Sequence, residues 1–219
     1  MASRSEISVR IMELGIVAVV RTPTFELVQP ACEALIKGGV LAVEITMTVP
    51  NALEALRDVS RRFGSEALLG AGTILNAEQC GEAIQAGAQY VISPITKLEI
   101  VFAAHARNKP VMLGAYTPTE AQLAHEAGAD FIKIFPADKL GPGYIKSLRA
   151  PLPHLRIVPT GGVDLQTAPE FLKAGCAALG VGSSLLTAEI LKKRDWAELT
   201  RLAGEYVRVV RETRTPSAG

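Results

Sequence analysis

Four short stretches of this chain repeat one local pattern and decide its fold: "KGGVLAVEIT" (37–46), "QAGAQYVISP" (85–94), "EAGADFIKIF" (126–135) and "KAGCAALGVG" (173–182). In each stretch a helix-like segment ends on a glycine, which is Gly39, Gly87, Gly128 or Gly175, and an apolar run begins at once. These glycines are separated by 48, 41 and 47 residues. Each interval holds two strand–helix units, so the repeat predicts four double units and eight strands.

The whole chain alternates in the same way. Its short apolar runs, read as buried strands, cover residues 15–21, 41–47, 67–73, 90–93, 110–116, 131–136, 155–160 and 177–183. Segments with helical spacing lie between them, such as 76–88, where Asn76 is a candidate N-cap, and a last helix covers 196–211. We therefore expect one (β/α)8 TIM barrel over residues 1–213, followed by a frayed tail over 214–219.

An open doubly wound sheet is the alternative fold. Such sheets usually have five or six strands and a glycine-rich phosphate turn after the first strand. Here the first predicted strand is followed by "RTPTFE" (21–26), which contains no glycine. Eight strands without that turn favour the barrel.

Composition excludes several classes of function. The 219 residues are 48% hydrophobic, enough to bury a full core, and carry a formal net charge of +1 with 5% aromatic residues. This balance predicts neither a basic stripe nor a stacking platform for nucleic acid. Three widely spaced cysteines and an N-terminus without a signal-peptide core favour a reducing cytoplasm. No apolar run is long enough to span a membrane.

Polar residues gather where the predicted strands end, which is the catalytic end of a barrel. They are Arg21, Glu44, Thr46, Thr48, Gly72, Thr73, Ser93, Pro94, Tyr116, Thr117, Lys133, Thr160, Gly161, Gly162, Gly182, Ser183 and Ser184. This set contains a lysine, a carboxylate and several hydroxyl groups.

Lys133 is the most unusual of these residues. Side chains alternate along a strand, so Phe131, Lys133 and Phe135 share one face, while Ile132 and Ile134 face the outer helices. This alternation turns Lys133 into the barrel, where loss of water lowers the pKa of an amine and favours the neutral nucleophile. A lysine that reaches solvent at the strand end, or that belongs to a structural ion pair, is the alternative interpretation.

Glu44 favours the catalytic interpretation. Ala42, Glu44 and Thr46 share the inward face of their strand. Two ionisable groups inside one barrel are costly unless they act together, and a carboxylate beside an amine can carry the protons of imine chemistry. The alternative is a structural ion pair.

Two glycine pairs predict a phosphate site. "PTGGV" (159–163) follows the seventh predicted strand and "GVGSS" (180–184) follows the eighth, where barrels commonly bind phosphate through backbone N–H groups.

Together, "VEIT", "GAGTIL", "ISP", "IKIFPA", "PTGGV" and "GVGSS" resemble, in order and over nearly the whole chain, the 2-keto-3-deoxy-6-phosphogluconate (KDPG) / 4-hydroxy-2-oxoglutarate (KHG) aldolase family. The resemblance implies a trimeric barrel and a class I aldolase without cofactor or metal, which cleaves KDPG to pyruvate and glyceraldehyde 3-phosphate, and also KHG to pyruvate and glyoxylate. It implies Lys133 as the Schiff-base lysine and Glu44 as the general acid/base. The implied substrate contacts are Thr73, Pro94, Phe135, Thr160, Gly161, Gly162, Gly182 and Ser183.

One departure from the family pattern concerns the pyruvate carboxylate. Many members carry an arginine a few residues after the glutamate, and this chain has none in "EITMT" (44–48). We expect Arg21, at the end of the first strand, to replace it, against the alternative of a surface arginine.

Other functions remain open at this stage. The epimeric substrate 2-keto-3-deoxy-6-phosphogalactonate is a rival within the family. A phosphate-binding barrel isomerase or synthase would use the same glycine loops but gives no reason for an inward lysine. A phosphosugar-binding protein without activity is the candidate from another class. The three histidines show no metal-ligand spacing, so no metal site is predicted.

Overall fold

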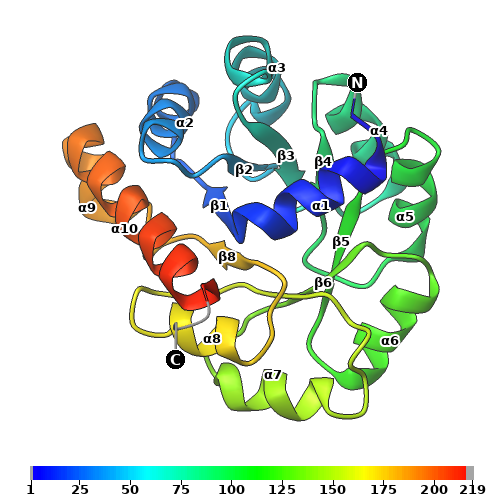
Figure 1. The fold of residues 1–219 in the computed structure, drawn as a ribbon. Coiled ribbons are helices and arrows are strands. Elements are labelled where there is room, and N and C mark those ends of the chain that lie inside the picture. The colour runs from blue at the N-terminus through cyan, green and yellow to red at the C-terminus, as the bar shows by residue number, and fades with distance from the viewer. Residues whose placement is uncertain (1, 216–219) are drawn as a thin grey trace.

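Eight parallel strands form a nearly closed barrel surrounded by helices (Figure 1). The structure is a computed structural model and describes residues 2–215. The strands are β1 (Ile16–Val20), β2 (Ala42–Thr46), β3 (Leu68–Gly72), β4 (Tyr90–Ile92), β5 (Val111–Ala115), β6 (Phe131–Ile134), β7 (Ile157–Pro159) and β8 (Leu179–Val181). Each strand lies within one of the predicted apolar runs.

The helices follow the strands in alternation. They are α1 (Arg4–Leu14), the 3-10 helix η1 (Phe25–Leu27), α2 (Val28–Lys37), α3 (Ala52–Phe63), α4 (Ala77–Gln85), α5 (Leu98–His105), α6 (Pro118–Glu126), α7 (Gly141–Arg149), α8 (Ala168–Lys173), α9 (Ala188–Lys193) and α10 (Trp196–Arg214). Asn76 caps α4 as predicted, because its side chain accepts a hydrogen bond of 2.8 Å from the Gln79 N–H.

The sheet order confirms the barrel. Strands pair in the sequence β7-β6-β5-β4-β3-β2-β1-β8, every pair parallel, and a single bridge between Thr160 and Gly180 joins the two end strands. The four repeat glycines explain the regular return of the chain. Their φ angles are +89°, +111°, +95° and +90°, so each turns a helix end directly into the next strand in a conformation that favours glycine.

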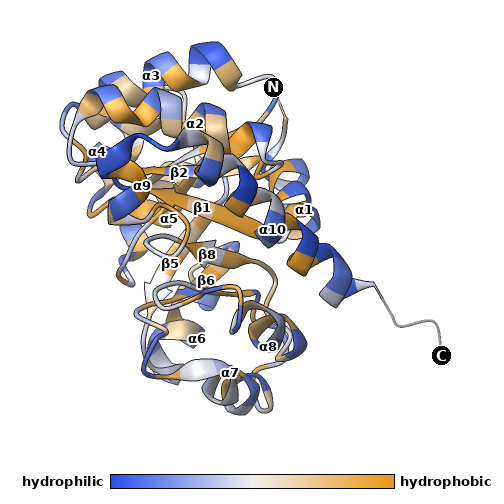
Figure 2. Ribbon diagram, turned by 90° about the vertical axis from the view of Figure 1, so that its left-hand side faces the viewer, coloured by the Kyte–Doolittle hydropathy of each residue, from blue (hydrophilic) through white to orange (hydrophobic). Residues whose placement is uncertain are grey.

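Two apolar layers hold the barrel together. Helices around it, such as α3, carry both hydrophobic and hydrophilic residues (Figure 2). The larger layer lies between strands and helices and includes Ile132 and Ile134 of β6. The smaller layer fills the barrel interior and includes Phe131 of β6 and Ala42 of β2. The predicted alternation along β2 and β6 is therefore confirmed.

Helix α1 was not anticipated from the sequence. It lies across one end of the barrel, where Ile7 and Ile11 pack into the interior layer (Figure 1). Its N-terminal signal is a capping box in which Ser3 and Glu6 bond reciprocally, and Gly15 ends it with a φ of +69°. The apolar side chains of α1 close the end of the barrel opposite to the catalytic end.

The chain is ordered slightly further than expected at its C-terminus. Helix α10 extends through Arg214, whose guanidinium donates to the carbonyl groups of Met12 and Ala177. The expected tail therefore begins too early at residue 214, because these contacts fix the last turn. Residues 216–219 lie outside the described residues.

Candidate active site

The centre of the site is a buried lysine–glutamate pair. Lys133 Nζ lies 3.8 Å from Glu44 Oε1, with 7% and 2% of the two side chains exposed. Strand β6 supplies the lysine and strand β2 supplies the carboxylate, both from their inward faces. The separation exceeds a normal hydrogen bond, so the two groups are close enough to exchange protons through a small intervening group without being locked together.

Glycines on the neighbouring strand make room for the carboxylate. A Cβ atom at Gly72 of β3 would lie 1.7 Å from Glu44 Oε1, so any side chain there would displace the carboxyl group. The register pairs Glu44 with Gly70 and Thr46 with Gly72, which places the carboxyl over a strand face without side chains. Gly72 is thus required by packing against Glu44, and Gly70 by packing against the ring of Tyr90.

Burial changes the acid–base behaviour of Glu44. Loss of water raises its pKa above the usual value of a glutamate, while the positive charges of Lys133 and Arg21 oppose this change. A carboxyl group with a raised pKa can both accept and return a proton near neutral pH, which is what a general acid/base requires.

A cavity of about 330 Å³ opens beside this pair. Its lining residues are Val19, Arg21, Phe135, Thr160, Gly161, Gly162, Val163, Asp164, Gly182, Ser183, Ser184 and Leu186. Seven of the predicted substrate contacts are among them. Phe135 connects the cavity with the pair, because its ring centroid lies 5.3 Å from Lys133 Nζ.

The glycine loops after β7 and β8 offer donors to an anion. Gly161 and Gly162 have φ angles of +89° and +72°, and no acceptor within residues 2–215 engages their backbone N–H groups or that of Ser183. Ser184 donates its hydroxyl to the Val163 carbonyl, so Ser183 carries the hydroxyl that remains for a ligand. Consecutive free N–H groups in a left-handed turn form an anion-binding concavity.

Asp164 is a cavity residue that the sequence reasoning missed. Its carboxylate accepts hydrogen bonds from the Thr167 N–H and hydroxyl groups and from the Gln166 N–H, which lower its pKa. The aspartate therefore orders the turn before α8 through its Oδ1 atom. Its position one residue after "PTGGV" and three before Thr167 was a capping signal in the sequence.

Two predicted substrate contacts lie outside this cavity. Thr73 follows β3 with a φ of +61°, a conformation that is unfavourable for a β-branched residue. Pro94 follows β4, and a Cβ at Gly114 of β5 would come within 2.1 Å of its carbonyl carbon and oxygen. Both are half-buried at the same end of the barrel as Lys133.

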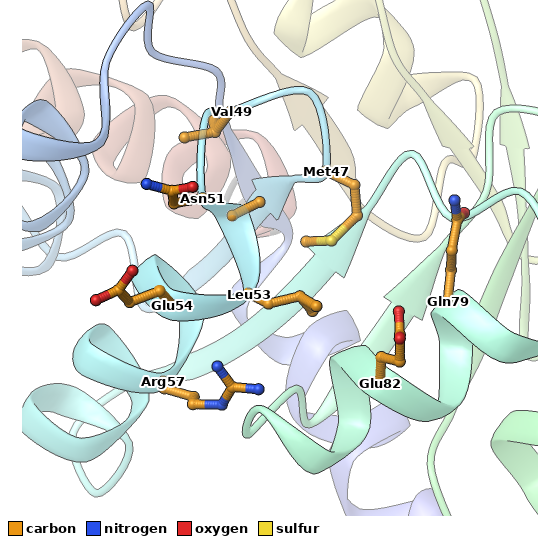
Figure 3. Close-up of a pocket in the computed structure, with 9 residues that line it drawn as sticks. Met47, Val49, Asn51, Leu53, Glu54, Arg57, Gln79 and Glu82 are labelled. Atoms are coloured by element: carbon orange, nitrogen blue, oxygen red, sulfur yellow. The ribbon is translucent and has the colours of Figure 1, made fainter.

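A second, larger groove of about 470 Å³ lies on the outer flank between α3 and α4 (Figure 3). It is lined by Met47, Val49, Asn51, Ala52, Leu53, Glu54, Arg57, Gln79 and Glu82. None of the predicted site residues is among them. Size alone does not identify an active site. The free N–H groups of the smaller cavity, and Phe135 in its lining next to Lys133, favour that cavity.

The histidines do not form a metal site. His105 Nε2 lies 3.0 Å from Asp130 Oδ2, and His125 stacks against His154 with ring centroids 4.5 Å apart. Within residues 2–215, no group of three His, Cys, Asp or Glu side chains is arranged to hold an ion. Of the helices in the same range, none is long and apolar enough to cross a membrane.

Comparison with known proteins agrees with this geometry. The family model "KDPG and KHG aldolase" matches residues 7–202. The 2-dehydro-3-deoxy-6-phosphogalactonate aldolase of Escherichia coli strain K12 is 36% identical over 177 residues, 80% of this chain and 86% of that protein. The KHG/KDPG aldolase of the same strain is 33% identical over 195 residues, 88% of this chain and 90% of that protein.

A solved structure of an aldolase also resembles this chain over most of its length. The KDPG aldolase of Legionella pneumophila, with pyruvate captured at low pH as a covalent carbinolamine intermediate, has a TM-score of 0.81 and 29% identity. The match covers 87% of this chain and 92% of that one. The chain belongs to the KDPG and KHG aldolase family, and it is an aldolase, a carbon–carbon lyase.

Proposed function

We propose that this protein cleaves 2-keto-3-deoxy-6-phosphogluconate to pyruvate and glyceraldehyde 3-phosphate through a Schiff base on Lys133. It also cleaves 4-hydroxy-2-oxoglutarate to pyruvate and glyoxylate. The observation that carries this proposal is the buried Lys133–Glu44 pair, 3.8 Å apart, beside a cavity whose glycine loops suit a phosphate.

The mechanism follows from the charges. The neutral Lys133 amine attacks the C2 ketone, and loss of water gives a protonated imine. The imine draws the electrons of the C3–C4 bond as Glu44, through a water molecule, takes the proton of the C4 hydroxyl. The aldehyde leaves, C3 of the enamine is protonated, and water hydrolyses the imine to pyruvate and the free amine. No metal or cofactor takes part in these steps.

The remaining residues hold the two ends of the substrate. Thr73 and Pro94 line the pyruvate end, and Phe135 packs beside the imine. Thr160, Gly161, Gly162, Gly182 and Ser183 hold the phosphate. Arg21 binds the pyruvate carboxylate in place of the arginine missing after Glu44, which agrees with its position in the cavity and its electrostatic effect on Glu44.

Borohydride reduction in the presence of pyruvate, followed by peptide mass spectrometry, tests the imine. We expect a reduced pyruvate adduct on Lys133 that requires both reagents, and no adduct in Lys133→Met. Lys139→Met is the matched control, because Lys139 lies nearby in sequence with 85% of its side chain exposed. A folded wild-type protein without the adduct would revive the isomerase or synthase and the phosphosugar-binding protein.

The C4 epimer is the open choice of substrate. The phosphogalactonate acid is the second candidate, since the phosphogalactonate aldolase of E. coli is 36% identical to this chain. Comparing kcat/KM for the two epimers decides between them. Arg21→Ala is expected to raise KM for both epimers about tenfold or more, while an unchanged KM would remove Arg21 from the site.

We also propose that the protein works in the cytoplasm as a homotrimer. Exposed apolar side chains support self-association. Leu75 follows β3, Ile95 follows β4, and Leu98 and Phe102 lie on α5, where Phe102 is 65% exposed. Phe102→Glu should dissociate the assembly in sedimentation velocity, and Val9→Glu, at an exposed apolar residue of α1, should not. A wild-type monomer at micromolar concentration would contradict the trimer.

A further inference from the structure

Tyr90 is a buried group that the mechanism above does not use. It begins β4, none of its surface is exposed, and its side chain belongs to the interior layer of the barrel. Its hydroxyl finds no hydrogen-bond partner within residues 2–215. A phenylalanine would fill the same space without a buried unsatisfied hydroxyl, which is destabilising, so the hydroxyl calls for an explanation.

A second unsatisfied atom lies in the same part of the barrel. Glu44 Oε1 is fully buried and also lacks a hydrogen-bond partner within the described range. A carboxylate oxygen accepts hydrogen bonds, and a neutral phenol donates one. The two unmatched atoms are therefore chemically complementary.

The glycines of β3 bring these two groups to one face. A Cβ at Gly70 would lie 2.4 Å from the Tyr90 ring carbon that carries the hydroxyl, and one at Gly72 would lie 1.7 Å from Glu44 Oε1. Residues two apart on a strand point the same way, about 7 Å from each other. The two side chains therefore lie next to each other on this face. The hydroxyl and Oε1 form no direct hydrogen bond within residues 2–215, and one water molecule that accepts from the phenol and donates to the carboxylate would satisfy both atoms.

We propose that Tyr90 is a positioning residue for Glu44, donating its hydroxyl through one water molecule to the carboxylate that carries protons during cleavage. This inference rests on the proposed function. Burial and the charge of Glu44 both raise the pKa of Tyr90, which keeps the phenol protonated as a donor. A donor aimed at the carboxylate stabilises its charged form and so offsets part of the effect of burial on Glu44.

Loss of the Tyr90 hydroxyl changes the pKa of Glu44 in one definite direction. Removing the hydroxyl leaves the Glu44 carboxylate with less support, so its pKa rises further. Cleavage needs the deprotonated carboxylate to accept the C4 proton, so the acidic limb of the kcat/KM profile moves to higher pH. The other charged groups that act on Glu44 are Lys133 of β6 and Arg21 after β1, and both are unchanged in a Tyr90→Phe variant.

The test is the pH profile of cleavage by the full chain with Tyr90→Phe. We expect the acidic limb to move to higher pH by about one unit, with a roughly tenfold loss of kcat/KM at pH values below the limb. The melting temperature should not change. Tyr144→Phe is the control: its hydroxyl, on α7, bonds the Tyr116 carbonyl, and its profile should not move. An unmoved limb in Tyr90→Phe would overturn the inference.

Two further measurements separate this inference from the proposed function. Borohydride trapping of pyruvate on Lys133 must succeed in the wild-type protein and in Tyr90→Phe, because the tyrosine does not touch the amine. Failure in the wild type overturns the proposed function, whereas success with an unmoved pH limb overturns only the role of Tyr90. In a Glu44→Gln background, where the limb set by Glu44 is absent, Tyr90→Phe should not lower the residual kcat/KM further, and an additional loss would contradict coupling through Glu44.

Discussion

At the scale of single residues, Thr73 has the least favourable backbone conformation near the candidate site. Its φ of +61° is unfavourable for a β-branched side chain, yet it follows β3 directly at the catalytic end of the barrel. Strained conformations of this kind persist where the surroundings enforce them and cluster at functional positions. The glycines just before it, Gly70 and Gly72, leave room for Tyr90 and Glu44 and do not relieve the turn at Thr73.

Thr73→Gly is expected to raise the free energy of unfolding by up to about 1 kcal/mol, because relief of strain exceeds the entropic cost of glycine. The lost hydroxyl should raise KM for the keto acid severalfold. Thermal melts and steady-state kinetics measure both. Asn51→Gly, at an exposed residue with a φ of +54°, is the control with unchanged kinetics. Destabilisation of Thr73→Gly would show that the conformation is not strained.

At the scale of elements, capping chemistry determines where the helices that follow the strands begin. Helix α6 starts with a capping box in which Glu120 accepts from the Tyr116 and Thr117 N–H groups at 2.9 and 2.8 Å, and the Thr117 hydroxyl accepts from the Glu120 N–H. These bonds hold the pKa of Glu120 below its usual 4.5. The turn that follows β5 is thereby fixed at the catalytic end.

Glu120→Gln should lower the free energy of unfolding by about 0.5 kcal/mol at pH 7, a value reduced for solvent exposure. Because the folded pKa is depressed, this stabilisation is present above pH 4.5 and is lost as the pH falls through the folded value. Urea titrations of both proteins at pH 7 and pH 3 measure the difference. A gap between variant and wild type that persists at pH 3 would contradict the ionic origin.

At the scale of the whole molecule, the two ends of the chain close the barrel together. Helix α1 covers the end away from the catalytic site, and Arg214 of α10 joins it by donating to the Met12 carbonyl and to the Ala177 carbonyl before β8. The Arg214 side chain lies against Gly15, where a Cβ would come within 2.5 Å of it. Closure at this end leaves the opposite end free for the reaction.

Arg214→Ala is expected to lower the free energy of unfolding by about 1 kcal/mol, because two carbonyl groups lose a charged donor that is partly open to solvent. kcat should not change, since the contact lies at the far end of the barrel. Arg211→Ala, one turn earlier on the exposed face of α10, is the control. Equal stability of the two variants would mean that the hydrogen bond from Arg214 of α10 to α1 does not stabilise the fold.

The sequence by itself determined the eight strands, the inward orientation of Lys133 and Glu44, and the glycine loops after β7 and β8. These features depend on local rules: side chains alternate along a strand with a period of two, and a pair of glycines after a strand indicates a turn. Local rules did not reveal α1, because its apolar residues are not confined to one face of the helix: Ile7 and Ile11 are buried, whereas Val9 is exposed. Its capping box is only a short signal.

Only the tertiary structure decided which of these groups meet. Residues of β2, β3, β4 and β6 are far apart along the chain, and the 3.8 Å between Lys133 and Glu44 depends on strand register and barrel closure. The same holds for Tyr90 and Glu44, which share one face of β3 because Gly70 and Gly72 leave that face without side chains. Contact across a barrel is a property of its closed sheet, and no local pattern in the sequence encodes it.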